Sequence, residues 1–292
     1  MALEHWVGLA TSARIGGKLM TRLLAHFGSV EAVFEADEDE LQVVSGIGVK
    51  IAAAIIGVDL NQIAVSLTAW EQSGIKILTW ESPDYPANLL QNDDAPPVLF
   101  LRGTLHPSDK RAVAIIGTRK ATPDFLQIAH RLGYDLAERG FTVISGLALG
   151  IDTAAHKGAL AAGGRTLAVL GSGLDQVYPP QNLSLSEQMI DCGGLLSELH
   201  PHTVVNAQNL IARNRIVSTL GKGVIVVQTE MKGGSMNTAR RALSNNQRVL
   251  AVVGGGEGCD YLLGKKAHPI HPNWIVWDQL LPLLDSPPDS VA

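Results

Sequence analysis

The clearest pattern along the chain is an apolar run at 112–116 that stops at glycine and is followed by an amphipathic segment. The run suits a strand buried on both faces, and it ends at Gly117-Thr118-Arg119-Lys120. The segment after it places apolar side chains on one helical face, at Phe125, Ile128, Leu132 and Leu136. Gly140 stands where a helix C-cap glycine is expected, and a second apolar run follows at 141–145. This strand–helix–strand unit predicts a right-handed parallel crossover.

The same alternation continues through the C-terminal half of the chain. The pattern predicts strands at 113–117, 141–145, 166–171, 194–197, 223–228 and 248–253. It predicts helices at 124–138, 152–162, 183–191, 207–219 and 235–245. The predicted strands are rich in valine, isoleucine and leucine, as strands covered on both faces should be. We therefore predict an α/β fold, an extended Rossmann-like doubly wound parallel sheet.

Changes of pattern divide the chain into parts. Residues 1–66 contain short amphipathic helices and predict a small N-terminal all-helical domain. Residues 67–111 predict a connecting segment, with a strand at 75–80 and a proline-opened strand at 95–103 that joins the edge of the sheet. The Rossmann-like domain is expected at 112–282 and a disordered tail at 283–292.

The N-terminal domain contains a short internal repeat. Arg14-Ile15-Gly16-Gly17-Lys18 recurs as Gly46-Ile47-Gly48-Val49-Lys50, each time before an apolar helix. A glycine turn between two helices resembles the helix-hairpin-helix motif, and the second copy matches it better. In many such motifs the backbone N–H groups contact DNA phosphates. The acidic run 35–40 would repel a DNA backbone, so both DNA contact and a packing or protein-docking role stay open.

Composition and charge narrow the classes of function. The net charge is −5, yet residues 113–270 hold fifteen basic side chains against eleven acidic ones, which permits phosphate binding. No apolar run reaches the ~18 residues of a membrane span, and no signal sequence is evident at the N-terminus. Cys192 and Cys259 fit no metal or redox spacing, so we expect a cytoplasmic protein with inert thiols and no membrane contact.

Glycine turns follow five of the predicted strands and therefore lie at one carboxyl edge of the sheet. They are Gly117, Gly146, Gly171-Ser172-Gly173, Gly233-Gly234-Ser235 and Gly254-Gly255-Gly256. Glycine lets a ligand approach the backbone, and the helix N-termini that follow offer N–H donors to anions. With Arg119 at the first turn, the edge is expected to bind an anionic ligand.

The common motifs of cofactor binding and catalysis are missing. The turn at Gly117 lacks the glycine spacing of a dinucleotide site, and no P-loop or nucleophile–histidine signature is present. Asp152 and His156 share a helix face, as an acid–base pair or, more commonly, as an N-capping aspartate and a packed histidine. No cofactor and no metal are expected.

Two arginines in one predicted helix should point in different directions. Arg213 and Arg215 diverge by ~200° around a helix, so one is expected at the ligand edge. The other would pair internally, with Glu198 or Glu230.

Several consecutive motifs together resemble the DNA-processing protein DprA (Smf) family. They are Val113-Ala-Ile-Ile-Gly-Thr-Arg119, Ser145-Gly-Leu-Ala-Leu-Gly-Ile-Asp-Thr-Ala-Ala-His156, Ala168-Val-Leu-Gly-Ser-Gly-Leu-Asp175, Val177-Tyr-Pro-Pro-Gln-Asn182, Leu195-Leu-Ser-Glu198, Arg213-Asn-Arg-Ile-Val-Ser218 and Gly233-Gly-Ser-Met-Asn-Thr238-Ala239. Asp84-Tyr-Pro86 and Pro96-Pro-Val-Leu-Phe-Leu-Arg-Gly103 look similar too. The resemblance runs from about residue 5 to residue 280, in the family's order.

The resemblance implies a homodimer that binds single-stranded DNA, protects it and loads the RecA recombinase in natural transformation, without catalytic turnover. The DNA-binding residues that it implies are Gly117, Thr118, Arg119, Lys120, Gly146, Gly173, Asn209, Arg213, Arg215, Gly234, Ser235 and Thr238. Two features depart from the family. Asn209-Leu210-Ile211-Ala212 replaces an Asn-Phe-Pro stretch, which removes an aromatic side chain, and no C-terminal winged-helix-like domain is expected.

Two other functions fit parts of the same pattern. Glu230 and Gly233-Gly-Ser-x-x-Thr238 resemble the acid and the Gly-Gly-x-Gly-Thr turn of phosphoribohydrolases, although the Gly-Thr dipeptide of that turn is missing. An interaction scaffold with a vestigial pocket, meeting its partner through the acidic helical domain, is the third alternative.

Overall fold

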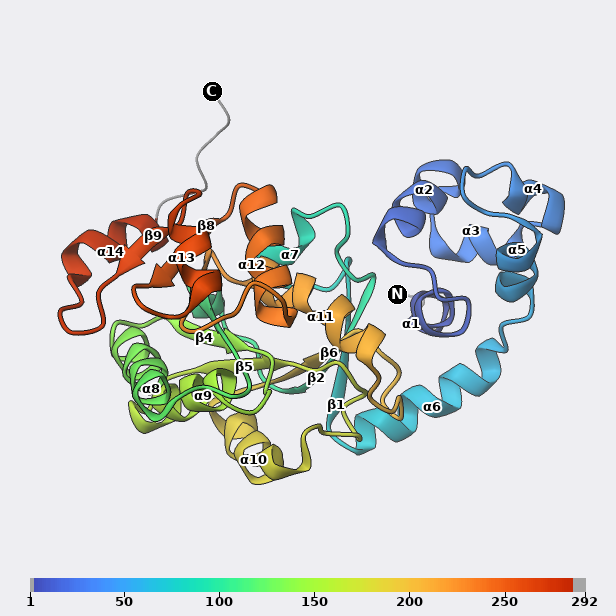
Figure 1. Cartoon of the computed structure of the whole chain (residues 1–292). Helices are drawn as coiled ribbons and strands as arrows, with labels where there is room; N and C mark the ends of the chain where they lie inside the picture. The colour runs from blue at the N-terminus through green and yellow to red at the C-terminus, as the bar shows by residue number, and fades with distance from the viewer. Residues whose placement is uncertain (1–2, 286–292) are drawn as a thin grey trace.

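The computed structural model describes residues 3–285, which form a group of N-terminal helices beside a larger α/β part (Figure 1). The first part contains α1 (Leu3–Val7), a π-helical turn η1 (Gly8–Ser12), α2 (Gly17–Phe27), α3 (Val30–Glu35), α4 (Glu38–Gln42), α5 (Val49–Ile56) and α6 (Leu60–Gln72). Ser29 caps α3, Asp37 caps α4 and Asp59 caps α6, each accepting a backbone N–H bond. Polar caps and glycine turns thus divide this part into short helices.

The helices join the α/β part through α6. This helix runs past residue 66, where we placed the end of the helical domain, and continues to Gln72. Trp70 near its end is buried against Phe100 in an edge-to-face contact, with the ring centroids 5.4 Å apart. The two parts therefore share an apolar cluster instead of a flexible linker.

The described residues form a nine-stranded sheet in the order β1-β2-β6-β5-β4-β3-β7-β8-β9. The strands are β1 (Ile75–Thr79), β2 (Val98–Gly103), β3 (Ala112–Ile116), β4 (Thr142–Ser145), β5 (Thr166–Val169), β6 (Gly193–Ser197), β7 (Gly223–Val226), β8 (Arg248–Val252) and β9 (His268–Ile270). The strands from β6 to β9 in this order pair in parallel, whereas β1 and β2 add antiparallel pairs. The expected α/β sheet is confirmed, and the proline-opened strand starts at Val98.

Helices cover both faces of the sheet. One face carries α8 (Pro123–Glu138), α9 (Ile151–Ala161), α10 (Leu183–Cys192) and α14 (Trp277–Asp285). The other carries α7 (Ala87–Leu90), α11 (Ala207–Leu220), α12 (Gly234–Ser244) and α13 (Glu257–Leu263), and two 3-10 turns are η2 (Pro107–Lys110) and η3 (Pro180–Asn182). In β3, Val113 and Ile115 face the first layer while Ala114 and Ile116 face the second. This burial on both sides explains the continuous apolar run.

All six strands and five helices predicted from the alternation are present, with ends shifted by at most two residues. The short elements α7, α13 and β9 were not predicted. The disordered tail was expected to begin at 283, but α14 continues to Asp285, whose carboxylate pairs with Arg111. Residues 286–292 lie outside the described residues.

The strand order reverses beside β3. From β3 the chain moves outward through β4, β5 and β6, then returns to place β7 on the other side of β3. In doubly wound sheets, ligands bind outside the carboxyl ends of the strands at such a point. Within residues 3–285, no individual helix has the length and apolar composition to cross a membrane; only the bent pair α5 and α6 meets those criteria jointly.

Candidate nucleic-acid interface

A groove of about 500 Å³ opens at the carboxyl ends of β3 and β7, where the strand order reverses. We call it the sheet-edge groove. The loops after β3, β4 and β7 and the helices α11 and α12 form its walls. It brings together nine of the twelve predicted site residues: Gly117, Thr118, Arg119, Lys120, Gly146, Arg213, Gly234, Ser235 and Thr238.

Three exposed cations surround the groove. Arg119 and Lys120 follow β3, and Lys232 follows β7. Within residues 3–285, none of these three side chains makes a hydrogen bond or an ion pair, so their charge is available to a ligand. Glu230 is an exposed carboxylate on the same wall. The exposed side chains therefore carry a net positive charge, as a phosphate-binding groove requires.

The start of α12 supplies backbone donors to the groove. Gly233 is the N-cap residue with a φ of 147°, a conformation that favours glycine, and its helix has no side-chain cap. The Thr238 hydroxyl donates to the Gly234 carbonyl at 2.9 Å, and the hydroxyls of Ser235 and Thr229 lie 2.8 Å apart. These hydroxyls hold the turn, while the first N–H groups of α12 have no side-chain acceptor and can bind an anion.

A buried arginine and a buried carboxylate form the floor of the groove. Arg213 is only 5 % exposed, and its guanidinium donates to the carbonyls of Gly146, at 2.5 Å, and Val169. A side chain at Gly146 would overlap this guanidinium, so glycine is required there by close approach. Burial lowers the pKa of Arg213 to about 10, although the Asp152 carboxylate opposes this change. Arg213 is therefore charged at neutral pH and positions the loop after β4.

The sequence suggests that Asp152 is an N-cap residue, but in the structure it is not. The N-cap of α9 is Gly150, and Asp152 lies one residue inside the helix. Its carboxylate accepts the N–H groups of Gly146 at 3.1 Å and Ala148 at 3.3 Å. Burial raises the pKa of Asp152, while Arg213 and these N–H donors act in the opposite direction. The carboxylate thus holds the glycine turn in place beside Arg213.

His156 is a packed core residue. It is fully buried, and its Nδ1 lies 2.6 Å from the Thr166 hydroxyl. Burial, together with the nearby Arg213, lowers the pKa of His156 to about 3, so the imidazole is neutral at physiological pH. Within residues 3–285, no hydrogen bond joins His156 to Asp152. The packed-histidine alternative describes this position, and the pair is not arranged for acid–base catalysis.

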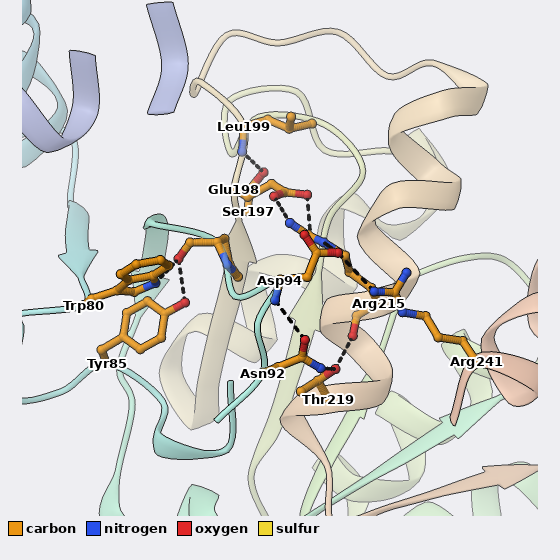
Figure 2. Close-up of polar contacts among 11 residues, drawn as sticks. Trp80, Tyr85, Asn92, Asp94, Ser197, Glu198, Leu199, Arg215, Thr219 and Arg241 are labelled. Carbon is orange, nitrogen blue, oxygen red and sulfur yellow. Dashed lines mark hydrogen bonds and ion pairs between the residues drawn. The ribbon is translucent and has the colours of Figure 1, made fainter. Parts of the chain in front are cut away.

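Arg215 lies on the other side of α11, away from the groove. Figure 2 shows its guanidinium between Glu198, with bonds of 3.0 and 2.5 Å, and Asp94, at 3.2 Å. Asp94 also pairs with Arg241 of α12 at 3.0 Å. The two arginines therefore diverge as expected, and Glu198 is the internal partner. Asp94 therefore links the loop at 91–97 to α11, through Arg215, and to α12, through Arg241, the two helices that form the groove walls.

Two further predicted residues lie outside the sheet-edge groove. Gly173 is buried beneath the carbonyls of His200 and Pro201, and its N–H donates to Thr203 at 2.8 Å. Close packing, not ligand approach, explains the glycine at that turn. Asn209 lies in the first turn of α11, where its N–H bonds to the side chain of the N-cap Asn206 at 2.8 Å.

The groove also contains residues that the sequence interpretation did not include. Lys232 and Asn214 line it, and Asn214 accepts from the Arg213 Nε at 3.1 Å. Lys232 lies between Glu230 and the glycine turn, in the loop that follows a strand. A basic residue in such a loop is the sequence feature that could have identified Lys232 as a site residue. Leu210 and Ile211 stand where the family's aromatic stretch was expected, and Ile211 is 58 % exposed. The groove wall there is aliphatic.

Comparison with known proteins identifies the chain. Residues 76–279 match the sequence pattern of the family described as DNA recombination-mediator protein A. The chain belongs to this family. Residues 11–59 separately match a SAM-like helix-hairpin-helix tandem, which includes both hairpins of the N-terminal repeat.

Relatives of the DNA recombination-mediator protein A family match along most of the chain. Protein Smf of Synechocystis is 35% identical over 91% of this chain and 69% of its own, and DNA processing protein DprA of Bacillus subtilis is 34% identical over 84% and 83%. The crystal structure of DNA processing protein A from Streptococcus pneumoniae superposes with a TM-score of 0.77 at 27% identity, covering 89% of this chain and 91% of that one. DNA processing protein A from Helicobacter pylori, whose structure concerns a single-stranded DNA binding mode, gives a TM-score of 0.63 at 30% identity, covering 72% and 96%.

Proposed function

We propose that this protein binds single-stranded DNA in the sheet-edge groove and acts as a recombination mediator. In this role it protects incoming DNA in the cytoplasm and loads the RecA recombinase during natural transformation, as a homodimer and without catalysis. Membership of the DNA recombination-mediator protein A family supports the role in recombination.

The convergence of Arg119, Lys120 and Lys232 on the open start of α12 carries the proposal. Lysine and arginine side chains bind DNA phosphates, and a helix N-terminus adds backbone donors. The buried pair of Arg213 and Asp152 fixes the loop after β4 beneath them. The groove therefore offers a fixed positive surface to a phosphate backbone.

Preference for a single strand is supported by the apolar wall. Leu210 and Ile211 can contact unpaired bases, which are hidden inside a duplex. The absence of an aromatic ring there removes stacking that is worth about 1–3 kcal/mol per base. We therefore expect binding to depend mainly on phosphate contacts, with little preference among base sequences.

A competition experiment tests the binding proposal. A labelled oligo-dT strand should bind the protein at low salt, and unlabelled single strands of mixed sequence should displace it far better than the matching duplex. Failure of the strand to bind at low salt would contradict the proposal. RecA loading is tested separately, by RecA filament formation on strands coated with single-strand-binding protein, and the dimer by mass measurement in solution.

Glu230 favours one second candidate, a phosphoribohydrolase-like nucleotide enzyme. Its exposed carboxylate lines the groove close to the glycine turn before α12, and within residues 3–285 it forms no ion pair. Release of free base from nucleoside monophosphates, abolished by Glu230→Gln, would support that enzyme. Absence of base release together with salt-sensitive strand binding would leave the mediator as the function.

A further inference from the structure

A second hollow lies in the helical part, between α3, α4 and α5. We call it the α4–α5 cleft; its volume is about 380 Å³. Val33 and Ile55 form a buried floor, Phe34 is partly buried, and Ile56 is 54 % exposed. Figure 1 shows α4 and α5 on the side of the helical part that faces away from the sheet. The cleft is therefore separate from the sheet-edge groove.

The rim of the cleft is acidic. Glu35, Asp37 and Glu38 line it, and no basic side chain of residues 3–285 does. One carboxylate oxygen of Asp37, Oδ1, already accepts the Glu40 N–H at 2.9 Å in the cap of α4. Glu35 and Glu38 are exposed and, within residues 3–285, their carboxylates have no hydrogen-bond or ion-pair partner. Their negative charge is available to a ligand.

The acidic rim distinguishes between possible occupants. It repels a DNA backbone, although the hairpin at Gly46–Lys50 lies in the same part of the chain. A second copy docked symmetrically through this face would place the same carboxylates opposite each other, which is unfavourable. A protein segment with an apolar side chain flanked by lysine or arginine satisfies both the floor and the rim.

We propose that the α4–α5 cleft is a docking site for such a basic, apolar segment of a partner protein. The apolar anchor fills the space above Val33 and Ile55 and covers Ile56. The flanking cations pair with Glu35 and Glu38. The volume lies within the range of ~300–1,000 Å³ that is typical of binding pockets. The cleft gives the protein a contact for a partner that leaves the sheet-edge groove free.

A random peptide library displayed on phage tests the proposal with the full chain. Selected peptides should combine an apolar residue with neighbouring lysine or arginine, and their binding is then measured by fluorescence anisotropy. Ile56→Ser and the double variant Glu35→Lys/Glu38→Lys should each weaken binding about tenfold or more. The matched controls are Val65→Ser, at an exposed valine outside the cleft, and Glu71→Lys/Glu81→Lys; both should stay within about twofold.

Three results would overturn the docking site. They are selected peptides without basic residues, equal losses in the cleft and control variants, and displacement of the peptides by oligo-dT. Thermal unfolding and oligo-dT binding should be unchanged in every variant, which shows that the chain is folded and that the sheet-edge groove is intact. A variant that unfolds is replaced by the milder Ile56→Ala and Glu35→Gln.

Discussion

The sheet-edge groove and the helical part both contain glycine turns that precede a helix, but the residues buried beneath these turns differ. Beneath the groove, Arg213, Asp152 and His156 are buried. In the described part of the helical domain, residues 3–66, no polar or charged side chain is buried, and the core consists of residues such as Leu9, Met20 and Ile55. The groove thus rests on a polar floor, and the hairpins rest on an apolar one.

The two hairpins of the helical part also differ from each other. Gly17 of the first is packed against the backbone of Ala95, so that turn is covered. Gly48 of the second has open space around it, and the neighbouring Val49 is 60 % exposed. A glycine turn and a helix N-terminus are common to the groove and to both hairpins. Within residues 3–285, exposed cations without a hydrogen bond or ion pair occur in the groove (Arg119, Lys120 and Lys232) and in the hairpins (Arg14, Lys18 and Lys50). In the groove three of them line one hollow beside a helix N-terminus, whereas the hairpins lie near the acidic run 35–40, and this contrast supports our proposal that the groove binds phosphate.

We expect the largest effect on stability from a substitution in the floor of the groove. Arg213→Ala leaves the buried Gly146 and Val169 carbonyls without their donor and removes the positive charge near the buried Asp152 carboxylate, so we expect the free energy of unfolding to fall by about 3–5 kcal/mol. Urea unfolding measures the loss. Arg131→Ala, at an exposed arginine of α8, is the control and should change stability by less than about 1 kcal/mol. Normal stability with lost DNA affinity would show instead that Arg213 serves as a direct ligand contact.

The neutral His156 makes the floor sensitive to pH. Its pKa is about 3 in the folded protein, against 6.5 when exposed, so below pH 6.5 the unfolded chain binds a proton that the folded chain does not. Stability should therefore fall by up to about 1.4 kcal/mol per pH unit between pH 6 and 4. The raised pKa of Asp152 acts in the opposite direction above its ordinary value of 3.8. His156→Asn removes the titration, and its stability should depend less steeply on pH; equal slopes would contradict the assignment.

The exposed cations of the two regions should differ in DNA affinity. Lys232→Ala removes a groove cation, and we expect oligo-dT to bind about three- to tenfold more weakly, with a smaller salt dependence. Titration by fluorescence anisotropy at several salt concentrations measures both quantities. An unchanged affinity would remove Lys232 from the phosphate path.

The second hairpin should show the smallest effect. Lys50→Ala removes its cation, but the acidic residues at 35–40 surround the region with negative charge, so binding should change by less than about twofold. The same titration with Lys50→Ala and Lys232→Ala side by side provides the comparison. A loss at Lys50 as large as that at Lys232 would show that the helical part contacts DNA.

Local patterns were sufficient to predict most of the fold. The apolar run of β3 is continuous because alternate residues face two helix layers, so its strand could be recognised without any tertiary information. Because the predicted sheet is parallel, the turn at Gly117 and the cations after it are expected at the carboxyl edge of the sheet. In contrast, β9 has three residues and α13 seven, too few for a periodic signal.

The site was harder to predict because long-range contacts decide which residues face it. Helix geometry predicts that Arg213 and Arg215 diverge, but it does not predict their distant partners, the Gly146 and Val169 carbonyls for Arg213 and Asp94 for Arg215. Gly173 and Gly146 follow strands in the same way, yet the chain at 200–203 covers one and Arg213 underlies the other. Such packing partners come from distant loops, whose positions no local pattern contains.

The affinity of Arg119→Ala for oligo-dT, measured beside wild type and Arg131→Ala over a range of salt concentrations, tests the central claim most directly. We predict that Arg119→Ala loses about 1.5–3 kcal/mol of binding free energy, as for a charge-assisted hydrogen bond, and that its salt slope falls by about one phosphate contact. Arg131→Ala should bind like wild type. Equal binding by all three proteins would contradict the assignment of the sheet-edge groove as the DNA site.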